Sequence, residues 1–581
     1  MKYTSFVPLA LFALCLSCSG PIEKKPPTQT PAEFFEEYHE AYLRLNPLTA
    51  TFVGDNRYND TIPNFYTEAA REQNRIFNKK YLDKASAYDP EQLSKEDALS
   101  MKLLMYECRI NLEGDSIDFP SEYMPLSQLG GFHTTYGMLA SGTSAQPFNN
   151  ARDFDNWLSR LEDYMPIIDT VMANMKKGIN TGYVLPKPLI EKLIPQLEDL
   201  ATLPVEENVV YSPIKSMPDS IAQKEKQRLT AAYETMGLRL IGKFRELTDF
   251  VKTDYLAAGR STSGIGSLPN GSEAYNFLIK YYTTTDLNAD EVFDIGMQEV
   301  KRIRGEMEAV KERVGYEGDL LSFFDFVREN PELMPFDDPQ QVIDNYNTML
   351  DIMKPHLDSL FNIQPKTPFE VRRIEAFREA TSSAHYIPGS LDGTRPGIFY
   401  VPIPDVKRYN FFADENTFLH EAIPGHHFQI SIQQENQDIP EFRKILGYGA
   451  FAEGWGLYAE SGEMGLALGL YQDPYQYFGM LSWDMHRALR LVTDAGIHSK
   501  GWSREKAIQF SLDNEAESEA TITSEIERYM ANPGQALSYK IGQLKILELR
   551  EKAMNELGHK FDIRGFHDIV LLTGSVPLSI L

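Results

Sequence analysis

The chain has 581 residues, a hydrophobic content of 42% and a net charge of −26, with 57 Lys and Arg against 83 Asp and Glu. This acidic balance argues against a nucleic-acid partner, which needs a basic surface, and against electrostatic attraction to anionic lipid. The length exceeds the usual size of one domain, so we expect a division into lobes.

The N-terminal residues 1–17 are typical of a secretory signal peptide. Lys2 precedes the apolar run VPLALFALCL, which is too short to span a bilayer. The run ends in LSCSG, which resembles a bacterial lipobox, so we expect cleavage before Cys18 and lipid on its thiol. An ordinary cleaved signal peptide is the alternative. Residues 18–31 would then form a polar, Pro-rich tether.

The rest of the chain reads as mainly helical. After Cys15 and Cys18 only Cys108 remains, which excludes an intramolecular disulfide within the mature body of the protein. Asn288 and Glu291 predict a capping box at the start of a long helix. Apolar residues recur at helical spacing over residues 31–47, 94–112 and about 224–258. The clearest strand is GIFYVPI, residues 397–403, so the predicted fold is mainly α with a little sheet.

The stretch FLHEAIPGHHFQ, residues 418–429, begins like the zinc-peptidase signature H-E-x-x-H, but Pro424 stands where the second histidine belongs. Six residues separate His420 from His426, a rise of roughly 9 Å in a regular helix. Two histidine nitrogens on one zinc ion must approach to about 3–3.5 Å. Because Pro424 and Gly425 favour a break in the helix, we expect His426 to swing back towards His420.

A second helical segment, GYGAFAEGWGLYAESGE, carries Glu453 and Glu460 seven residues apart, and therefore on one face. Aromatic residues flank both carboxylates. A carboxylate on an apolar helix face needs a partner, and a metal ion with its surrounding ligands would supply one. The alternative is that FLHEAIPGHHFQ is only a helix end with solvated histidines.

These motifs carry a family resemblance. H-E-A-I-P-G-H-H, A-E-G-W-G-L-Y-A-E and PGQALSYKIG resemble the bacterial domain-of-unknown-function family numbered 885, as do SLPNGSEAYNFLIKYYTTTDLNADEVFDIGMQEVKRI and the C-terminal FHDIVLLTGSVPLSIL. The resemblance extends from about residue 32 onward. The family is similar in turn to helical zinc peptidases of the thimet oligopeptidase and carboxypeptidase Taq kind. This implies a large, mainly α, zinc-peptidase-like fold with a small β element beside the metal helix and a deep central cleft. We expect a helical N-terminal lobe over 32–260 and a catalytic lobe over 261–581.

The zinc-peptidase resemblance also implies roles for individual residues. In those enzymes a glutamate about 25 residues after the second histidine completes the metal site; here Glu453 follows His426 by 27. Zinc would lie on His420, His426 and Glu453, with water as the fourth ligand. Glu421 would act as the general base, and Glu460 and His427 would support the ligands. The Pro–Gly insertion departs from the peptidase pattern, and His427 stays the alternative second histidine.

Further candidates lie outside the two motifs. Tyr539 is the first choice as a donor to the oxyanion, followed by Tyr529 and His498. Arg528 and Lys540 would bind a substrate carboxylate, which would make the enzyme a carboxypeptidase. The strand that contains Tyr400 would run along the cleft and pair with an extended peptide as an added strand. The alternative for each is a role in packing, surface pairing or the scaffold.

Three functions are compatible with these residues. The first is a zinc-dependent metallopeptidase that hydrolyses short peptides in the bacterial cell envelope, anchored by lipid on Cys18 and facing the periplasm. The second is a zinc hydrolase of another amide or an ester. The third is a non-catalytic lipoprotein that binds peptides, which Glu421 disfavours because a structural site needs ligands and no base. We expect no obligate protein partner.

Overall fold

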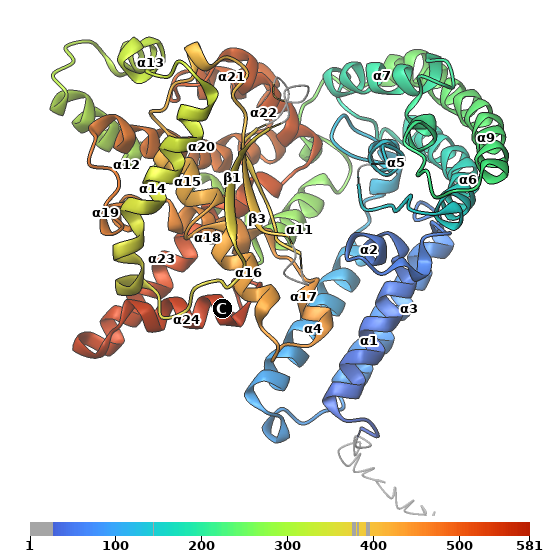
Figure 1. The fold of residues 1–581 in the computed structure, drawn as a ribbon, viewed down its shortest axis with the longest axis horizontal. Coiled ribbons are helices and arrows are strands. Elements are labelled where there is room, and N and C mark those ends of the chain that lie inside the picture. The colour runs from blue at the N-terminus through green and yellow to red at the C-terminus, as the bar shows by residue number, and fades with distance from the viewer. Residues whose placement is uncertain (1–26, 143, 375–378, 380–382, 391–394) are drawn as a thin grey trace, which may run out of the picture.

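The computed structural model describes residues 27–142, 144–374, 379, 383–390 and 395–581. The predicted signal peptide and Cys18 lie outside these residues, as does most of the predicted tether. Helices dominate the described chain, which confirms the mainly α prediction (Figure 1). None of the described helices combines the length and apolar character needed to cross a bilayer. Cys108 is a buried free thiol.

The first helix of the N-terminal part begins at Pro31, the last residue of the predicted tether. Thr30 caps the first helix through a capping box with Glu33. The helices here are α1 (Pro31–Leu45), α2 (Pro47–Phe52), α3 (Glu68–Ala85), α4 (Lys95–Ser116), α5 (Phe132–Ala140), α6 (Ala151–Thr181), α7 (Lys187–Thr202), α8 (Ser212–Lys215), α9 (Gln223–Phe250) and α10 (Leu256–Ala258). A π-helical turn, Val251–Tyr255, joins α9 to α10, so the helix predicted to end near Ala258 is continuous.

The C-terminal part contains the remaining helices. They are α11 (Gly271–Thr283), α12 (Ala289–Arg313), α13 (Leu320–Glu329), α14 (Pro339–Leu360), α15 (Asp414–Glu421), α16 (His426–Glu435), α17 (Glu441–Lys444), α18 (Gly449–Ala459), α19 (Gly462–Ala467), α20 (Pro474–His498), α21 (Arg504–Leu512), α22 (Glu519–Ala531), α23 (Ser538–Leu557) and α24 (Ile563–Thr573). The long helices α12 and α20 pack along each other, as do α18 and α23.

Separate apolar cores support the two parts. One core draws all its buried residues from positions 62–255, mainly from α5, α6, α7 and α9. The largest core lies almost entirely in the C-terminal part, with Leu103 of α4 as its N-terminal contribution. The first helices also contact the C-terminal part directly: Tyr448 donates a hydrogen bond to Glu107 (2.6 Å), and the rings of Phe35 and Phe442 lie 5.5 Å apart. Helices α1 and α4 therefore pack against residues that follow the stretch 418–429.

A three-stranded sheet accompanies the C-terminal helices. It contains β1 (Phe369–Arg373), β2 (His385–Ile387) and β3 (Gly397–Val401) in the order β1-β3-β2. The strand predicted over 397–403 is confirmed as β3. However, β1 pairs with it in parallel and β2 in antiparallel fashion. Because both edges of β3 are occupied, the prediction that this strand pairs with a peptide is wrong.

The predicted capping box of α12 is confirmed. The side chain of Asn288 accepts the N–H of Glu291 (3.1 Å), and the Glu291 carboxylate accepts the N–H of Asn288 (2.9 Å). The apolar face of the helix is interrupted by Glu299, whose carboxylate lies 2.9 Å from the ammonium group of Lys540 on α23. The polar residue on this face is therefore part of a buried ion pair.

Candidate metal centre

The candidate metal motif, FLHEAIPGHHFQ at residues 418–429, spans two helices that are separated by a sharp break. Helix α15 ends at Glu421 and α16 begins at His426, so the predicted break at Pro424–Gly425 is confirmed. A Cβ atom on Gly425 would lie 1.9 Å from the carbonyl oxygen of His420. The chain therefore turns back so closely that only glycine fits at this position.

The break brings two histidines and a glutamate together. The ring centroids of His420 and His426 are 4.7 Å apart. Glu453 Oε2 lies 3.5 Å from His420 Nε2 and 3.6 Å from His426 Nε2. All three ligand atoms lie within 4.8 Å of one another. Two atoms that each bind one tetrahedral zinc ion at about 2.1 Å are roughly 3.4 Å apart, so the two N–O distances suit such an ion.

Helix α18 supports this group from behind. Glu460, its C-cap residue, places a carboxylate oxygen 2.8 Å from His420 Nδ1. The indole N–H of Trp455 donates to the carbonyl of Pro424 (2.8 Å), which ties the break to α18. A Cβ atom on Gly456 would lie 2.8 Å from the His420 ring. The helix that carries Glu453 therefore also sets the position of His420.

The electrostatics of the group favour a cation. Burial lowers the pKa of His420, but the carboxylates of Glu460 and Glu453 outweigh this effect and hold the pKa well above its ordinary value. Burial raises the pKa of Glu453, but hydrogen bonds to His420 and His426 outweigh it and hold the pKa well below the usual range. A field that stabilises positive charge on buried imidazole would also stabilise a divalent ion. The donor set and its field therefore fit zinc.

Glu421 and His427 lie on the side of the motif that faces the sheet. The backbone N–H of Tyr386 in β2 donates to Glu421 Oε2 (3.0 Å). The hydroxyl of the same tyrosine lies 2.8 Å from His427 Nδ1. His427 is buried, and burial lowers its pKa to about 4. Of the two adjacent histidines, His426 joins His420 and Glu453, whereas His427 is bonded to the tyrosine that orients Glu421.

A cavity of about 750 Å³ adjoins the group. Its lining includes His420, Glu421, His426, Glu453, Glu460 and Tyr539, together with His385 and Tyr386 of β2. Tyr539 is thus the one predicted oxyanion donor that lines this cavity among the residues the structure describes.

Three other predicted residues do not line the cavity. Tyr529 is buried and donates from its hydroxyl to Glu525 (2.8 Å). His498 is also buried; its Nδ1 accepts the N–H of Ile265 (3.1 Å), and its Nε2 lies 3.0 Å from the carbonyl of Tyr529. Arg528 donates to Glu525 and to Gln535. These side chains link α20, α22 and neighbouring loops.

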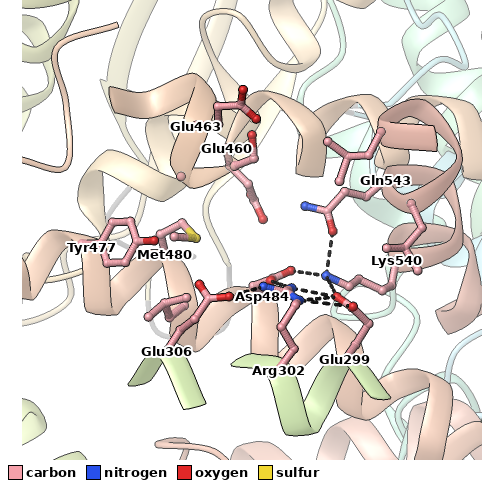
Figure 2. A pocket seen from close by; sticks show the side chains of 15 residues that line it. Glu299, Arg302, Glu306, Glu460, Glu463, Tyr477, Met480, Asp484, Lys540 and Gln543 are labelled. Carbon is pink, nitrogen blue, oxygen red and sulfur yellow. Dashed lines mark hydrogen bonds and ion pairs between the residues drawn. The ribbon is translucent and has the colours of Figure 1, made fainter. Parts of the chain in front are cut away.

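Lys540 lines a second, smaller cavity of about 260 Å³ (Figure 2). Its side chain is 1% exposed and lies 2.5 Å from Asp484 and 2.9 Å from Glu299, with Gln543 as a further acceptor at 2.8 Å. The structure thus uses Lys540 to neutralise buried carboxylates. The ring of Tyr400 stacks on His385 at 5.4 Å, which places it beside β2 and outside the lining of the larger cavity.

Comparison with known proteins identifies the family. Residues 47–581 match the family described as bacterial protein of unknown function, DUF885. The chain belongs to this family. It is similar in structure to a candidate lipoprotein from Colwellia psychrerythraea, with 25% identity and a TM-score of 0.85 over 95% of this chain and 97% of that one. A candidate lipoprotein of unknown function from Shewanella oneidensis shares the fold, with 18% identity and a TM-score of 0.76 over 95% and 98% of the two chains. No curated protein matches the chain.

The family match confirms the family predicted from the sequence, whereas one wall of the larger cavity was not predicted. Helix α20 contributes Trp483, His486, Arg487 and Arg490 to the lining. The signal in the sequence was their spacing of three or four residues in WDMHRALR, which places them on one helix face. Most residues of α20 are buried, and charged residues are mostly exposed in proteins. A helix face with two arginines, a histidine and a tryptophan is therefore unusual here.

The contact between Gly456 and His420 predicts the effect of one methyl group. Gly456→Ala should displace the His420 ring and lower the free energy of unfolding by about 1–3 kcal/mol, the usual cost of overpacking. Gly305→Ala is the matched control, because Gly305 lies in α12 and no atom beyond the adjacent residues and nearby backbone of its own helix lies within 4 Å of the added Cβ. That control should be neutral or stabilising by up to about 1 kcal/mol. Denaturant unfolding of both variants measures the difference, and equal stabilities would contradict the close contact.

Proposed function

We propose that the chain is a zinc-dependent metallopeptidase that hydrolyses short peptides. The observation that carries the proposal is the group of His420, His426 and Glu453, whose ligand atoms lie within 4.8 Å of one another. The carboxylate of Glu421 lies outside this group yet lines the same cavity. A structural zinc site is usually closed by four protein ligands, whereas three ligands with a cavity beside them are typical of catalysis.

Each residue of the site has a distinct role in the proposed reaction. Zinc held by His420, His426 and Glu453 would supply a Lewis acid that lowers the pKa of water and polarises a carbonyl. Glu421, oriented by the N–H of Tyr386, takes a proton from the attacking water and passes it to the leaving amine. Glu460 holds His420 through its Nδ1 and keeps Nε2 directed at Glu453. Tyr539 is available in the cavity to donate to the oxyanion.

The proposed location is the bacterial cell envelope. The candidate lipoproteins from Colwellia and Shewanella share the fold over nearly their whole length. The sequence LSCSG supplies Cys18 as the residue for lipid, and residues 19–26 precede the described part of the tether. We infer that lipid on Cys18 anchors the protein and that the catalytic part faces the periplasm.

Metal analysis tests the ligand set. The purified protein should bind about one zinc per chain, and His420→Ala, His426→Ala and Glu453→Ala should each lose most of it, because each removes one of three protein ligands. His427→Asn is the control, since asparagine keeps a polar atom near Tyr386 and His427 is not in the ligand group. It should retain zinc. Full metal content in the three ligand variants would contradict the site.

A second experiment tests catalysis separately from binding. Glu421→Gln preserves the shape of the side chain and removes the base, so it should keep the zinc content of the wild type. Hydrolysis of peptide substrates, identified by mass spectrometry of a peptide library, should fall by at least about a hundredfold. Near wild-type turnover with zinc bound would refute the general-base role. Loss of zinc in this variant would make Glu421 a ligand and favour a structural or binding site.

A third experiment tests the anchor. Cells fed a labelled lipid precursor should label the wild-type protein, and Cys18→Ser should lose the label and release the protein into the soluble fraction. A chain with several acyl groups binds membranes stably, so the wild type should resist washing with high salt. Label retained by Cys18→Ser would contradict lipid attachment at this residue.

A further inference from the structure

One wall of the larger cavity carries positive charge that the metal centre does not use. Arg487 and Arg490 of α20 line this cavity together with the metal-binding group and Glu421. Among the described residues of its lining, these are the only arginines or lysines. Both guanidinium groups lie against the ring of Tyr539, at 4.9 Å for Arg487 and 4.4 Å for Arg490. The aromatic ring therefore brings two positive charges to one corner of the cavity.

Arg487 has no anionic partner among the residues that the structure describes. Its Nε atom is buried and forms no hydrogen bond. Its guanidinium lies between two aromatic rings, 4.8 Å from Trp483 and 4.9 Å from Tyr539. Cation–π contacts compensate only part of the cost of removing a guanidinium from water. The two rings therefore hold Arg487 in place while its Nε–H lacks an acceptor.

Arg490 is only partly satisfied. It is 5% exposed, and it donates to Glu525 (3.0 Å) and to the hydroxyl of Tyr529 (3.2 Å). Its Nη1 atom, in contrast, is buried without a partner. A buried N–H group that lacks an acceptor is unfavourable, and more so when the group is charged. An acceptor supplied by a ligand would remove this cost.

Two buried arginines elsewhere in the described chain have no buried nitrogen that lacks a partner. Arg160 is fully buried and donates to Gln146, Thr51 and several backbone carbonyls. Arg443 is 2% exposed and donates to Glu96, Ser100 and the carbonyl of Thr573. The unpaired nitrogens of Arg487 and Arg490 are therefore not a general property of buried arginines in this fold. They occur where the two side chains face a cavity.

We propose that Arg487 and Arg490 form a subsite for a carboxylate group of the bound ligand. A guanidinium presents parallel N–H donors that match the two oxygens of a carboxylate, which lysine does not. The other charged lining is mostly acidic, with Glu421, Glu453, Glu460, Glu517 and Glu525, so it repels an anion and leaves the arginine corner as the place to bind one. The evidence for this carboxylate subsite is the geometry of the two arginines. Its assignment as a contact to substrate rests on the proposed peptidase function.

This subsite specifies the substrate class. A carboxylate beside the metal centre selects peptides with a free C-terminus close to the scissile bond, as in carboxypeptidase or dipeptidase action. The same chemistry occurs in an Asp or Glu side chain, so two sources share it. An amidated C-terminus removes the first source and leaves the second unchanged.

Calorimetric titration of three peptides separates these sources. The probes are tri-alanine, tri-alanine amide and Ala-Glu-Ala amide, titrated into the zinc-loaded Glu421→Gln protein to prevent turnover. Tri-alanine should bind at least about tenfold more tightly than its amide, which corresponds to about 1.4 kcal/mol. Arg487→Met in the same background should abolish this preference without loss of zinc. Tight, arginine-dependent binding of Ala-Glu-Ala amide would assign the carboxylate to a side chain instead.

Two further variants protect the test against misfolding. Arg487→Lys keeps the charge and loses the parallel donors, so it should recover only part of the affinity. Arg564→Met is the matched control, because Arg564 is an exposed arginine of α24 that pairs with Asp562, and it should bind tri-alanine like the parent. Three outcomes would overturn the subsite. The first is equal binding of all three peptides, and the second is no measurable binding of tri-alanine or of Ala-Glu-Ala amide. The third is an unchanged preference for tri-alanine over its amide in a folded Arg487→Met protein. Because this readout is binding, an absence of peptide hydrolysis by the wild-type protein would refute the peptidase proposal and leave the subsite standing.

Discussion

The interruption of the helix between Glu421 and His426 is the constraint on which the candidate site depends. A continuous helix would place His420 and His426 roughly 9 Å apart along its axis, too far for one ion. In the structure the two rings approach to 4.7 Å because the chain doubles back at Gly425, where a side chain would collide with the carbonyl of His420. The break also frees the backbone carbonyl of Pro424, which Trp455 then binds. The break in the helix thus brings the two histidines to the spacing of metal ligands, and helix α18 stabilises the break through Trp455.

Close packing on both sides of α18 explains the glycines in its sequence. On one side Gly456 allows the His420 ring to approach. On the other side, a Cβ atom on Gly454 would lie 2.5 Å from the Cα atom of Gly542 in α23. The small residues therefore let α18 pack between the metal motif and α23, the helix that carries Tyr539 and Lys540. The motif A-E-G-W-G combines a metal-ligand candidate, a hydrogen-bond donor to the break, and two glycines that permit close packing.

Structural features that depend on residues close together in the sequence were predicted, whereas side-chain partners that lie far apart in the sequence were missed. The capping box at Asn288, the strand at Gly397–Val401 and the break at Pro424–Gly425 follow from local rules, and the structure has each of them. The approach of Glu453 to the two histidines was predicted from motif resemblance and the shared face of its helix. Tyr529, His498 and Lys540 were selected by residue type near the C-terminus, and type alone does not separate a cavity wall from a packed core. Their partners, such as Ile265 and Glu299, lie more than 200 residues away in the chain.

The charges around the larger cavity show why its two cationic elements would depend on each other. Among the described residues of its lining are five glutamates and two arginines, so the carboxylates leave a negative field that would repel an anionic ligand. A divalent ion on His420, His426 and Glu453 would offset much of that field, and the arginines would then provide a directed contact for a carboxylate. Conversely, the acidic lining favours the ion before any ligand arrives. The excess of carboxylates in the whole chain argues against a nucleic-acid partner. Within the cavity, the same excess supports an order of events in which a metal ion binds before an anionic group does.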